Sequence, residues 1–132
     1  MRKVVLDTNI LVSALWSKQG NPFKIVEMLF TNEITLYYTD AMIEEYREVL
    51  CRDKFNFSKD RVESLLYELK KNGVIANSAI SAVMFTDETD RKFYDVAKTN
   101  DALLITGNTK HYPDEPFILT PLEFLLTLGE WE

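Results

Sequence analysis

Two strand-like segments of this chain end in polar side chains that could do chemistry. The apolar run Val4-Val5-Leu6 stops at Asp7-Thr8-Asn9, and the run 103–105 leads into Thr106-Gly107-Asn108. In open parallel sheets, ligands bind beyond the carboxyl ends of the strands, near the point where the strand order reverses. The structural alternative is helix capping, because Asp, Thr and Asn are all good N-cap residues. Both interpretations place Asp7 and Asn108 at the edge of a sheet.

Helical spacing sorts the remaining acids into inward and outward positions. Asp90 precedes Phe93 by three residues, so it shares the apolar face of its helix and points inward or toward a cleft. Glu45 lies at the edge of an apolar stripe, where an ordinary rim residue is the alternative interpretation. Asp95 falls on the other side of the helix that follows Asp90 and is expected to be a solvated surface charge.

Mutual repulsion would act on Asp7, Glu45 and Asp90 if the three side chains gathered at the same end of the sheet. A desolvated carboxylate without a partner is costly, and few basic residues lie on these faces. A divalent cation is a simple remedy, and magnesium binds one or two carboxylates together with waters and a substrate phosphate. Such a site suits phosphodiester hydrolysis, in which the metal activates water and stabilises developing charge. The three acids are therefore candidate metal ligands.

Alternating strands and helices must position these side chains. Apolar periodicity and capping residues predict strands at 4–6, 34–38, 102–106 and 117–119, and helices that begin near residues 21, 40, 58, 89 and 120. Residues 74–86 are ambiguous, with 82–85 as a candidate strand. The alternation predicts parallel pairing through right-handed crossovers, and hence an open α/β sheet with helices on both faces.

Composition narrows the class of protein. The 132 residues fit a single domain spanning 1–132, with 46% hydrophobic and 27% charged residues. Fifteen Lys and Arg against 21 Asp and Glu give a net charge of −6, which argues against a protein that mainly clamps nucleic acid electrostatically. Cys51 is the only cysteine, and neither a secretory signature nor a membrane-length apolar run is present. A cytoplasmic protein with no membrane partner is expected.

Four segments in order resemble the PIN-domain family. They are the runs 4–10, 45–50, 87–93 and 104–108, and the closing run 120–125 also fits. The resemblance covers essentially the entire chain. It implies a three-layer α/β/α sandwich around a parallel sheet, an acidic pocket that binds Mg²⁺ or Mn²⁺, and ribonuclease activity on single-stranded RNA. Many small members are toxins of type II toxin–antitoxin pairs, so an antitoxin protein is an expected partner.

The resemblance assigns roles residue by residue. Asp7 corresponds to the central metal ligand, Glu45 to the second acid and Asp90 to the third. Asn108 occupies the position of the usual fourth acid, which removes one negative charge and puts a second metal ion in question. An amide oxygen can still ligate a metal or hold a metal-bound water, and some branches of the family carry Asn at this position.

Several polar residues are candidates for supporting the site or contacting substrate. Thr8, Asn9 and Thr106 could bond a ligand or a metal water, with capping and turn formation as the alternative. Lys110 follows the site loop and could meet phosphate. His111, the only histidine, is expected mainly at the surface.

A basic rim and a few aromatic residues complete the candidates. Arg47, Arg91 and Lys92 lie on helices that carry site acids, although solvated helix faces are the alternative for Arg47 and Lys92. Trp16 and Tyr46 could stack on a base, but core or dimer packing is favoured. Trp16 and Trp131 permit a homodimer without requiring one.

Three functions follow as hypotheses. The first is a metal-dependent endoribonuclease acting on single-stranded RNA, the toxin of a toxin–antitoxin pair. The second is a PIN-like RNA- or protein-binding module that has lost catalysis through Asn108. The third is a phosphohydrolase of the haloacid dehalogenase type, which also begins with an apolar strand ending in Asp. That family carries a second acid two residues later, where this chain has Asn9.

Overall fold

A five-stranded parallel sheet forms the centre of the computed structural model, which describes residues 2–129. The strands are β1 (Arg2–Leu6), β2 (Ile34–Tyr38), β3 (Val74–Ile75), β4 (Leu103–Ile105) and β5 (Ile118–Leu119). Their order is β3-β2-β1-β4-β5, and every neighbouring pair is parallel. The α/β class predicted from the alternation of elements is confirmed.

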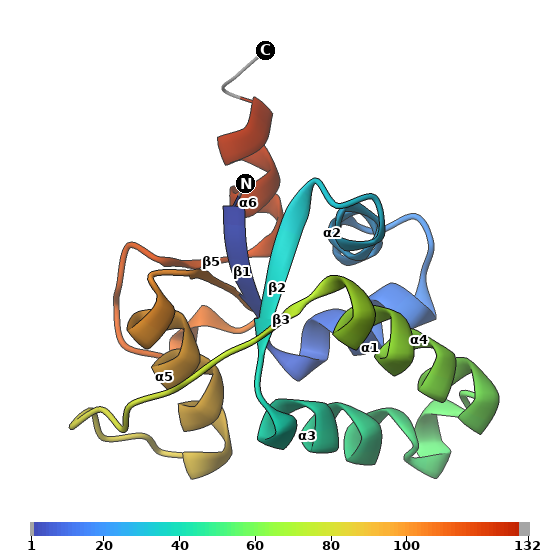
Figure 1. The fold of residues 1–132 in the computed structure, drawn as a ribbon, viewed down its shortest axis with the longest axis horizontal. Helices are drawn as coiled ribbons and strands as arrows, with labels where there is room; N and C mark the ends of the chain where they lie inside the picture. Colours follow the sequence, from blue (N-terminus) through green and yellow to red (C-terminus); the bar gives the residue numbers. More distant parts are fainter. Residues whose placement is uncertain (1, 130–132) are drawn as a thin grey trace.

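Helices cover both faces of this sheet (Figure 1). The six helices are α1 (Thr8–Trp16), α2 (Asn21–Phe30), α3 (Asp40–Leu50), α4 (Lys59–Asn72), α5 (Arg91–Asn100) and α6 (Pro121–Gly129). Figure 1 shows α1, α2 and α4 on one side of the sheet and α5 on the other, which is the three-layer arrangement. The helix α3 and the first turn of α5 lie at the end of the sheet where β1 and β2 finish. No helix among residues 2–129 is long and apolar enough to cross a bilayer.

Three of the predicted helix starts are held by side-chain caps. The Met42 amide donates to the Thr39 hydroxyl at 3.3 Å, and the Arg61 amide donates to Ser58 Oγ at 3.2 Å. At α6 the Glu123 amide donates to Thr120 Oγ1 at 3.1 Å, and the Thr120 amide donates to Glu123 Oε1 at 2.9 Å. This reciprocal pair is the capping box that the sequence predicts.

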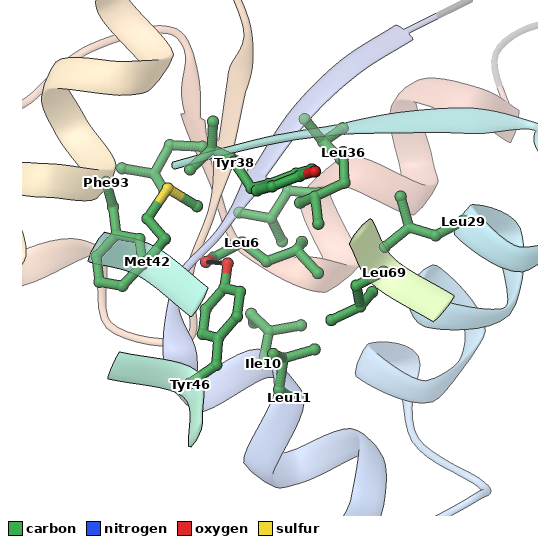
Figure 2. Packing of buried hydrophobic residues seen from close by; sticks show 14 of the residues in the cluster. Leu6, Ile10, Leu11, Leu29, Leu36, Tyr38, Met42, Tyr46, Leu69 and Phe93 are labelled. Atoms are coloured by element: carbon green, nitrogen blue, oxygen red, sulfur yellow. Dashed lines mark hydrogen bonds between the residues drawn. The ribbon is translucent and has the colours of Figure 1, made fainter. Parts of the chain in front are cut away.

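The central strand is buried on both sides, as its continuous apolar run predicts. Val4, Val5 and Leu6 have no measurable exposure. Tyr46 of α3 points its hydroxyl at the end of this strand and donates to the Leu6 carbonyl at 2.6 Å (Figure 2). The Tyr46 ring stacks on Phe93 of α5 with centroids 6.2 Å apart. Tyr46 is therefore a core residue, and it joins α3 and α5 to the end of β1.

The ambiguous segment after α4 does not form the candidate strand at 82–85. Residues 74 and 75 form β3, which pairs with Tyr37 and Tyr38, and the chain then leaves the sheet. Residues 76–86 instead pass over α5, where the Arg91 guanidinium donates to the carbonyls of Ser81 and Val83. Side chains of α5 bond several backbone groups of this segment, which takes the place of strand pairing at those groups.

Of the two tryptophans proposed for a dimer surface, Trp16 lies among the described residues. Trp16, at the end of α1, is 65% exposed and packs edge-on against Phe55 and Phe57. Trp131 lies outside the described residues. Self-association of the chain stays a prediction.

Candidate functional site

Asp7 stands at the carboxyl end of β1, beside the end of β4. These two strands are neighbours in the sheet, with Leu6 opposite Ile105, and the Asp7 amide donates to the Ile105 carbonyl at 3.0 Å. The strand order reverses here, because β2 and β3 lie on one side of β1 and β4 and β5 on the other. Asp7 therefore lies at the switch point of the sheet, where α/β folds bind their ligands.

Asp7 occupies the N-cap position of α1, but its carboxylate does not cap the helix. The side chain makes no capping hydrogen bond. Instead, Oδ2 of Asp7 accepts hydrogen bonds from the Thr106 hydroxyl and the Tyr112 hydroxyl, each at 2.9 Å. Capping as the sole role of Asp7 is wrong, because both donors come from the loop after β4.

These two bonds leave the other carboxylate oxygen of Asp7 available. Both donors reach Oδ2, and among residues 2–129 no donor bonds Oδ1. The Asp7 side chain is only slightly exposed. Burial, followed by the charge of Asp7, raises the pKa of Tyr112 far above its usual range, so Tyr112 remains a protonated donor. Thr106 and Tyr112 therefore fix the direction in which Oδ1 points.

The loops that follow β1 and β4 are bonded to each other. Thr106 Oγ1 also accepts from the Asn108 amide at 3.0 Å, and Asn9 Oδ1 accepts from the Gly107 amide at 3.2 Å. Thr106 and Asn9 thus shape the two loops, which is the structural role that the sequence left open. Asn108 is held close to Asp7 through Thr106.

Asp90 lies at the junction of a short 3-10 turn (Glu88–Asp90) and α5. Among residues 2–129 no donor hydrogen-bonds its carboxylate, and the imidazole Nδ1 of His111 is 3.8 Å from Oδ2. Burial, then repulsion from Asp7 and Asp87, raises the pKa of Asp90 to about 6. Asp90 is therefore near enough to Asp7 to feel its charge, and the His111 ring is the basic group that lies beside it.

Asn108 and His111 link this acid to the loop after β4. The Asn108 amide nitrogen is 3.0 Å from His111 Nε2, within a 3-10 turn (Thr109–His111). His111 therefore lies between Asn108 and Asp90. The exposed Lys110 belongs to the same turn.

Glu45 of α3 has a different environment from the two aspartates. Its Oε2 accepts from the Thr8 hydroxyl at 2.5 Å, and its Oε1 accepts from the Lys92 ammonium at 2.6 Å. The side chains of Glu45 and Lys92 are 21% and 25% exposed. Thr8 is the first residue of α1, directly after Asp7, so its bond to Glu45 in the middle of α3 brings Glu45 to the same end of the sheet as Asp7.

The oxygen atoms of Asp7 and Asp90 are the donors that could meet the needs of a divalent cation. Among residues 2–129, no three carboxylate, imidazole or thiol groups converge closely enough to hold a metal ion as they stand. Asp7 offers an oxygen without a donor, and the pKa of Asp90 is raised by burial and, second, by repulsion from Asp7, which a cation would oppose. These two aspartates fit a hard divalent cation that keeps several waters.

Asp95 corrects the prediction of a solvated surface charge. Its side chain is buried, at 3% exposure. It accepts from the Ser81 amide at 3.3 Å and lies 3.9 Å from the Arg91 guanidinium. The segment 76–86 covers this side of α5, so Asp95 anchors that segment.

The basic rim predicted from the sequence is largely engaged in ion pairs. Arg47 contacts Glu63 at 2.8 Å and Glu44 at 2.7 Å, and Arg91 contacts Glu88 at 2.9 Å. Arg47 and Arg91 therefore stabilise α3, α4 and the segment before α5. Lys92 alone of the three contacts a predicted site acid.

Comparison with known proteins decides the family. The family model described as PIN domain matches residues 3–110. The chain belongs to the PIN domain family. Members of this family are generally nucleases, which are phosphodiester hydrolases. The third sequence hypothesis, a haloacid dehalogenase-type phosphohydrolase, is set aside by this membership.

Relatives of this PIN domain extend the comparison. It is 31% identical over 109 residues to an uncharacterised protein of Methanocaldococcus jannaschii, covering 80% of this chain and 70% of that protein. Its fold is similar to a chain in the crystal structure of VapBC2 from Rickettsia felis bound to a DNA fragment from their promoter. That match has a TM-score of 0.59 and 18% identity, and it covers 89% of this chain and 96% of that one. At this identity the likeness concerns the fold.

Tyr112 is the site residue that sequence reasoning missed. It lies just beyond the matched family region and follows the only histidine of the chain in a polar turn. No local pattern in the sequence signals its role, because the residue is buried only by the path of the loop after β4.

Proposed function

We propose that this PIN domain is a metal-dependent endoribonuclease that hydrolyses phosphodiester bonds of single-stranded RNA. One observation carries the proposal: Asp7, at the switch point of the sheet, has one oxygen held by two hydroxyl donors and the other without a donor. The neighbouring Asp90 has its pKa raised by burial and by Asp7. Paired acids of this kind favour a cation between them.

Asp7 and Asp90 would hold Mg²⁺ or Mn²⁺, with Asn108 as a neutral oxygen donor; Glu45, the third acid, would either complete the metal shell or orient other groups of the site. When bound, the cation supplies Lewis-acid stabilisation of charge on a scissile phosphate. Thr106 and Tyr112 keep the Asp7 carboxylate in one orientation, because both donate to Oδ2. The exposed Lys110, in the turn after Asn108, would meet a neighbouring phosphate of the strand.

An antitoxin protein is the proposed partner. Many small PIN proteins belong to toxin–antitoxin pairs, and the fold likeness to a chain of VapBC2 supports this context. We propose the cytoplasm as the compartment, in keeping with a single cysteine, Cys51. Expression of the chain alone should arrest growth of a bacterial host, and the Asp7→Asn variant should not.

The test of the nuclease is cleavage of single-stranded RNA with Mg²⁺ or Mn²⁺ and with EDTA. The wild-type chain should cleave only with the divalent cation, and Asp7→Asn or Asp90→Asn should lower the rate by at least about a hundredfold. Asp101→Asn is the matched control, because Asp101 adopts a left-handed conformation that Asn also tolerates. Undiminished cleavage by Asp7→Asn contradicts the assignment.

A second candidate is a PIN-like module that binds RNA or protein without cleaving it. Glu45 is already bonded by Thr8 and Lys92, and Asn108 is neutral and bonded to His111. These contacts favour a site with weak metal affinity. Absence of both saturable Mn²⁺ binding and cleavage in the wild-type chain would support this candidate.

A further inference from the structure

Glu45 differs from Asp7 and Asp90 in having both carboxylate oxygens bonded. Oε2 accepts from the Thr8 hydroxyl and Oε1 accepts from the Lys92 ammonium. Asp7 Oδ1 and the Asp90 carboxylate have no hydrogen-bond donor among residues 2–129. A cation that recruited Glu45 would have to share its oxygens with the Thr8 hydroxyl and the Lys92 ammonium, whereas Asp7 Oδ1 and the Asp90 carboxylate accept no hydrogen bond among the described residues.

Lys92 is held in place but is not fully bonded. Its Nζ donates to Glu45 Oε1 at 2.6 Å and to the Thr89 carbonyl at 2.6 Å. An ammonium has three donors, so one donor has no oxygen or nitrogen acceptor among the described residues; Nζ also lies 5.4 Å from the centroid of the Phe93 ring. The side chain is 25% exposed, so a ligand at the mouth of the site can reach it.

The charge of the surroundings explains why a fixed ammonium matters here. The chain carries a net charge of −6, and Asp7 and Asp90 would repel an incoming phosphate. Arg47 and Arg91 are committed to Glu63, Glu44 and Glu88. Lysine is a compact point charge that binds phosphate well when it is oriented.

We infer that Glu45 acts as the anchor of Lys92 and not as a direct metal ligand, and that Lys92 donates its remaining N–H to a phosphate oxygen of the RNA strand. This inference rests on the proposed function for its substrate. The acids then have two tasks. Asp7 and Asp90 hold the cation. Glu45, itself bonded by Thr8, acts with the Thr89 carbonyl to orient the ammonium that donates to phosphate.

The first test measures binding of single-stranded oligouridylate in EDTA, where RNA stays intact, over a range of salt concentrations. Lys92→Gln should weaken binding about tenfold at low salt and reduce the slope of log K against log salt by about 0.7, the value for one phosphate contact on a single strand. Lys92→Arg should retain most of the affinity. Lys98→Gln, which removes the same charge from the same helix, should retain the wild-type slope.

The second test measures Mn²⁺ affinity by calorimetry without RNA. Lys92→Gln and Glu45→Gln should leave the affinity within about a factor of three, whereas Asp7→Asn should lower it by more than about tenfold. The double variant Lys92→Gln/Glu45→Gln leaves no unpaired charge, so it should keep wild-type thermal stability and still bind RNA weakly. That variant separates loss of the phosphate contact from loss of folding.

Two outcomes overturn the inference. If Glu45→Gln lowers Mn²⁺ affinity as much as Asp7→Asn does, Glu45 is a metal ligand. If Lys92→Gln raises Mn²⁺ affinity and leaves RNA binding unchanged, Lys92 only neutralises the acidic site. The proposed nuclease fails by a different result, namely Mn²⁺ binding and cleavage that survive Asp7→Asn.

Discussion

The Tyr112 hydroxyl donates a hydrogen bond to Asp7 Oδ2 at 2.9 Å, although the two residues are 105 positions apart in the sequence. Thr106 donates to the same oxygen. Two neutral donors on one oxygen stabilise the carboxylate without cancelling its charge. Asp7 is therefore held in one orientation in a nearly buried position and still presents Oδ1 to a cation.

Tyr112→Phe should weaken Mn²⁺ binding clearly while lowering the stability of the fold only slightly. The variant keeps the ring contact with Phe85, whose centroid is 6.1 Å away, and removes only the hydroxyl. We expect a loss of about 1 kcal/mol in the free energy of unfolding and a roughly tenfold lower Mn²⁺ affinity. Tyr94→Phe is the control, because the Tyr94 hydroxyl donates to Glu115 and not to Asp7. Equal Mn²⁺ affinities for the two variants would contradict a positioning role for Tyr112.

Asp90→Asn should stabilise the metal-free protein at neutral pH. The pKa of Asp90 is about 6 in the folded chain against an ordinary value of 3.8, so the folded state binds more protons between these values. The Asp90 contribution to stability therefore falls as pH rises from about 4 to above 6. In EDTA at pH 7.5 the variant should gain about 1–2 kcal/mol, less than the full shift implies because water screens part of the charge.

Thermal unfolding at several pH values checks this expectation. The gain should shrink as pH falls and disappear below about pH 3, where Asp90 is protonated in both states, and it should reverse at pH 7.5 when Mn²⁺ stabilises only the wild-type chain. A variant that is less stable than the wild type in EDTA at pH 7.5 would show that Asp90 is not under repulsion.

Asp95→Ala should loosen the segment 76–86 without affecting the metal site. The buried Asp95 carboxylate accepts from the Ser81 amide, and its loss leaves that amide without its partner. We expect about 2 kcal/mol of destabilisation and faster hydrogen exchange at Ser81. The exposed Asp114→Ala should change stability by less than about 0.5 kcal/mol. Unchanged exchange at Ser81 in Asp95→Ala would remove Asp95 as the anchor.

Asn108→Asp should increase divalent cation affinity. The Asn108 backbone is held beside Asp7 through Thr106, so a carboxylate there adds a negative charge to the site. We expect Mn²⁺ affinity to rise about tenfold or more, measured by calorimetry. Asn32→Asp adds the same charge at an exposed left-handed position and should leave the affinity unchanged. If both variants behave alike, position 108 is not part of the cation site.

Much of the fold was predictable because local signals agreed with it. The run Val4-Val5-Leu6 is apolar without alternation, which is typical of a strand buried on both faces, and its abrupt end at Asp7 marked the sheet edge. Thr39, Ser58 and Thr120 were recognisable as caps, and each makes its capping bond. These signals depend only on neighbouring residues.

The failures involve contacts between distant segments. Helical spacing gave the side of α5 on which Asp95 lies but not the segment that covers it, since residues 76–86 have no periodic pattern. The Tyr112 bond to Asp7 depends on the path of the loop after β4, which no local pattern specifies. The pairing of Glu45 with Lys92, 47 residues apart, depends on how α3 packs near α5. Sequence therefore located the acids, and tertiary packing decided their partners.

Calorimetric titration of the wild-type chain, Asp7→Asn and Asp101→Asn with Mn²⁺ tests most directly whether Asp7 belongs to a divalent cation site. We expect saturable binding by the wild type and by Asp101→Asn, and at least about a tenfold weaker affinity for Asp7→Asn. Equal binding by all three proteins, or none by the wild type, would contradict a cation site at the end of β1.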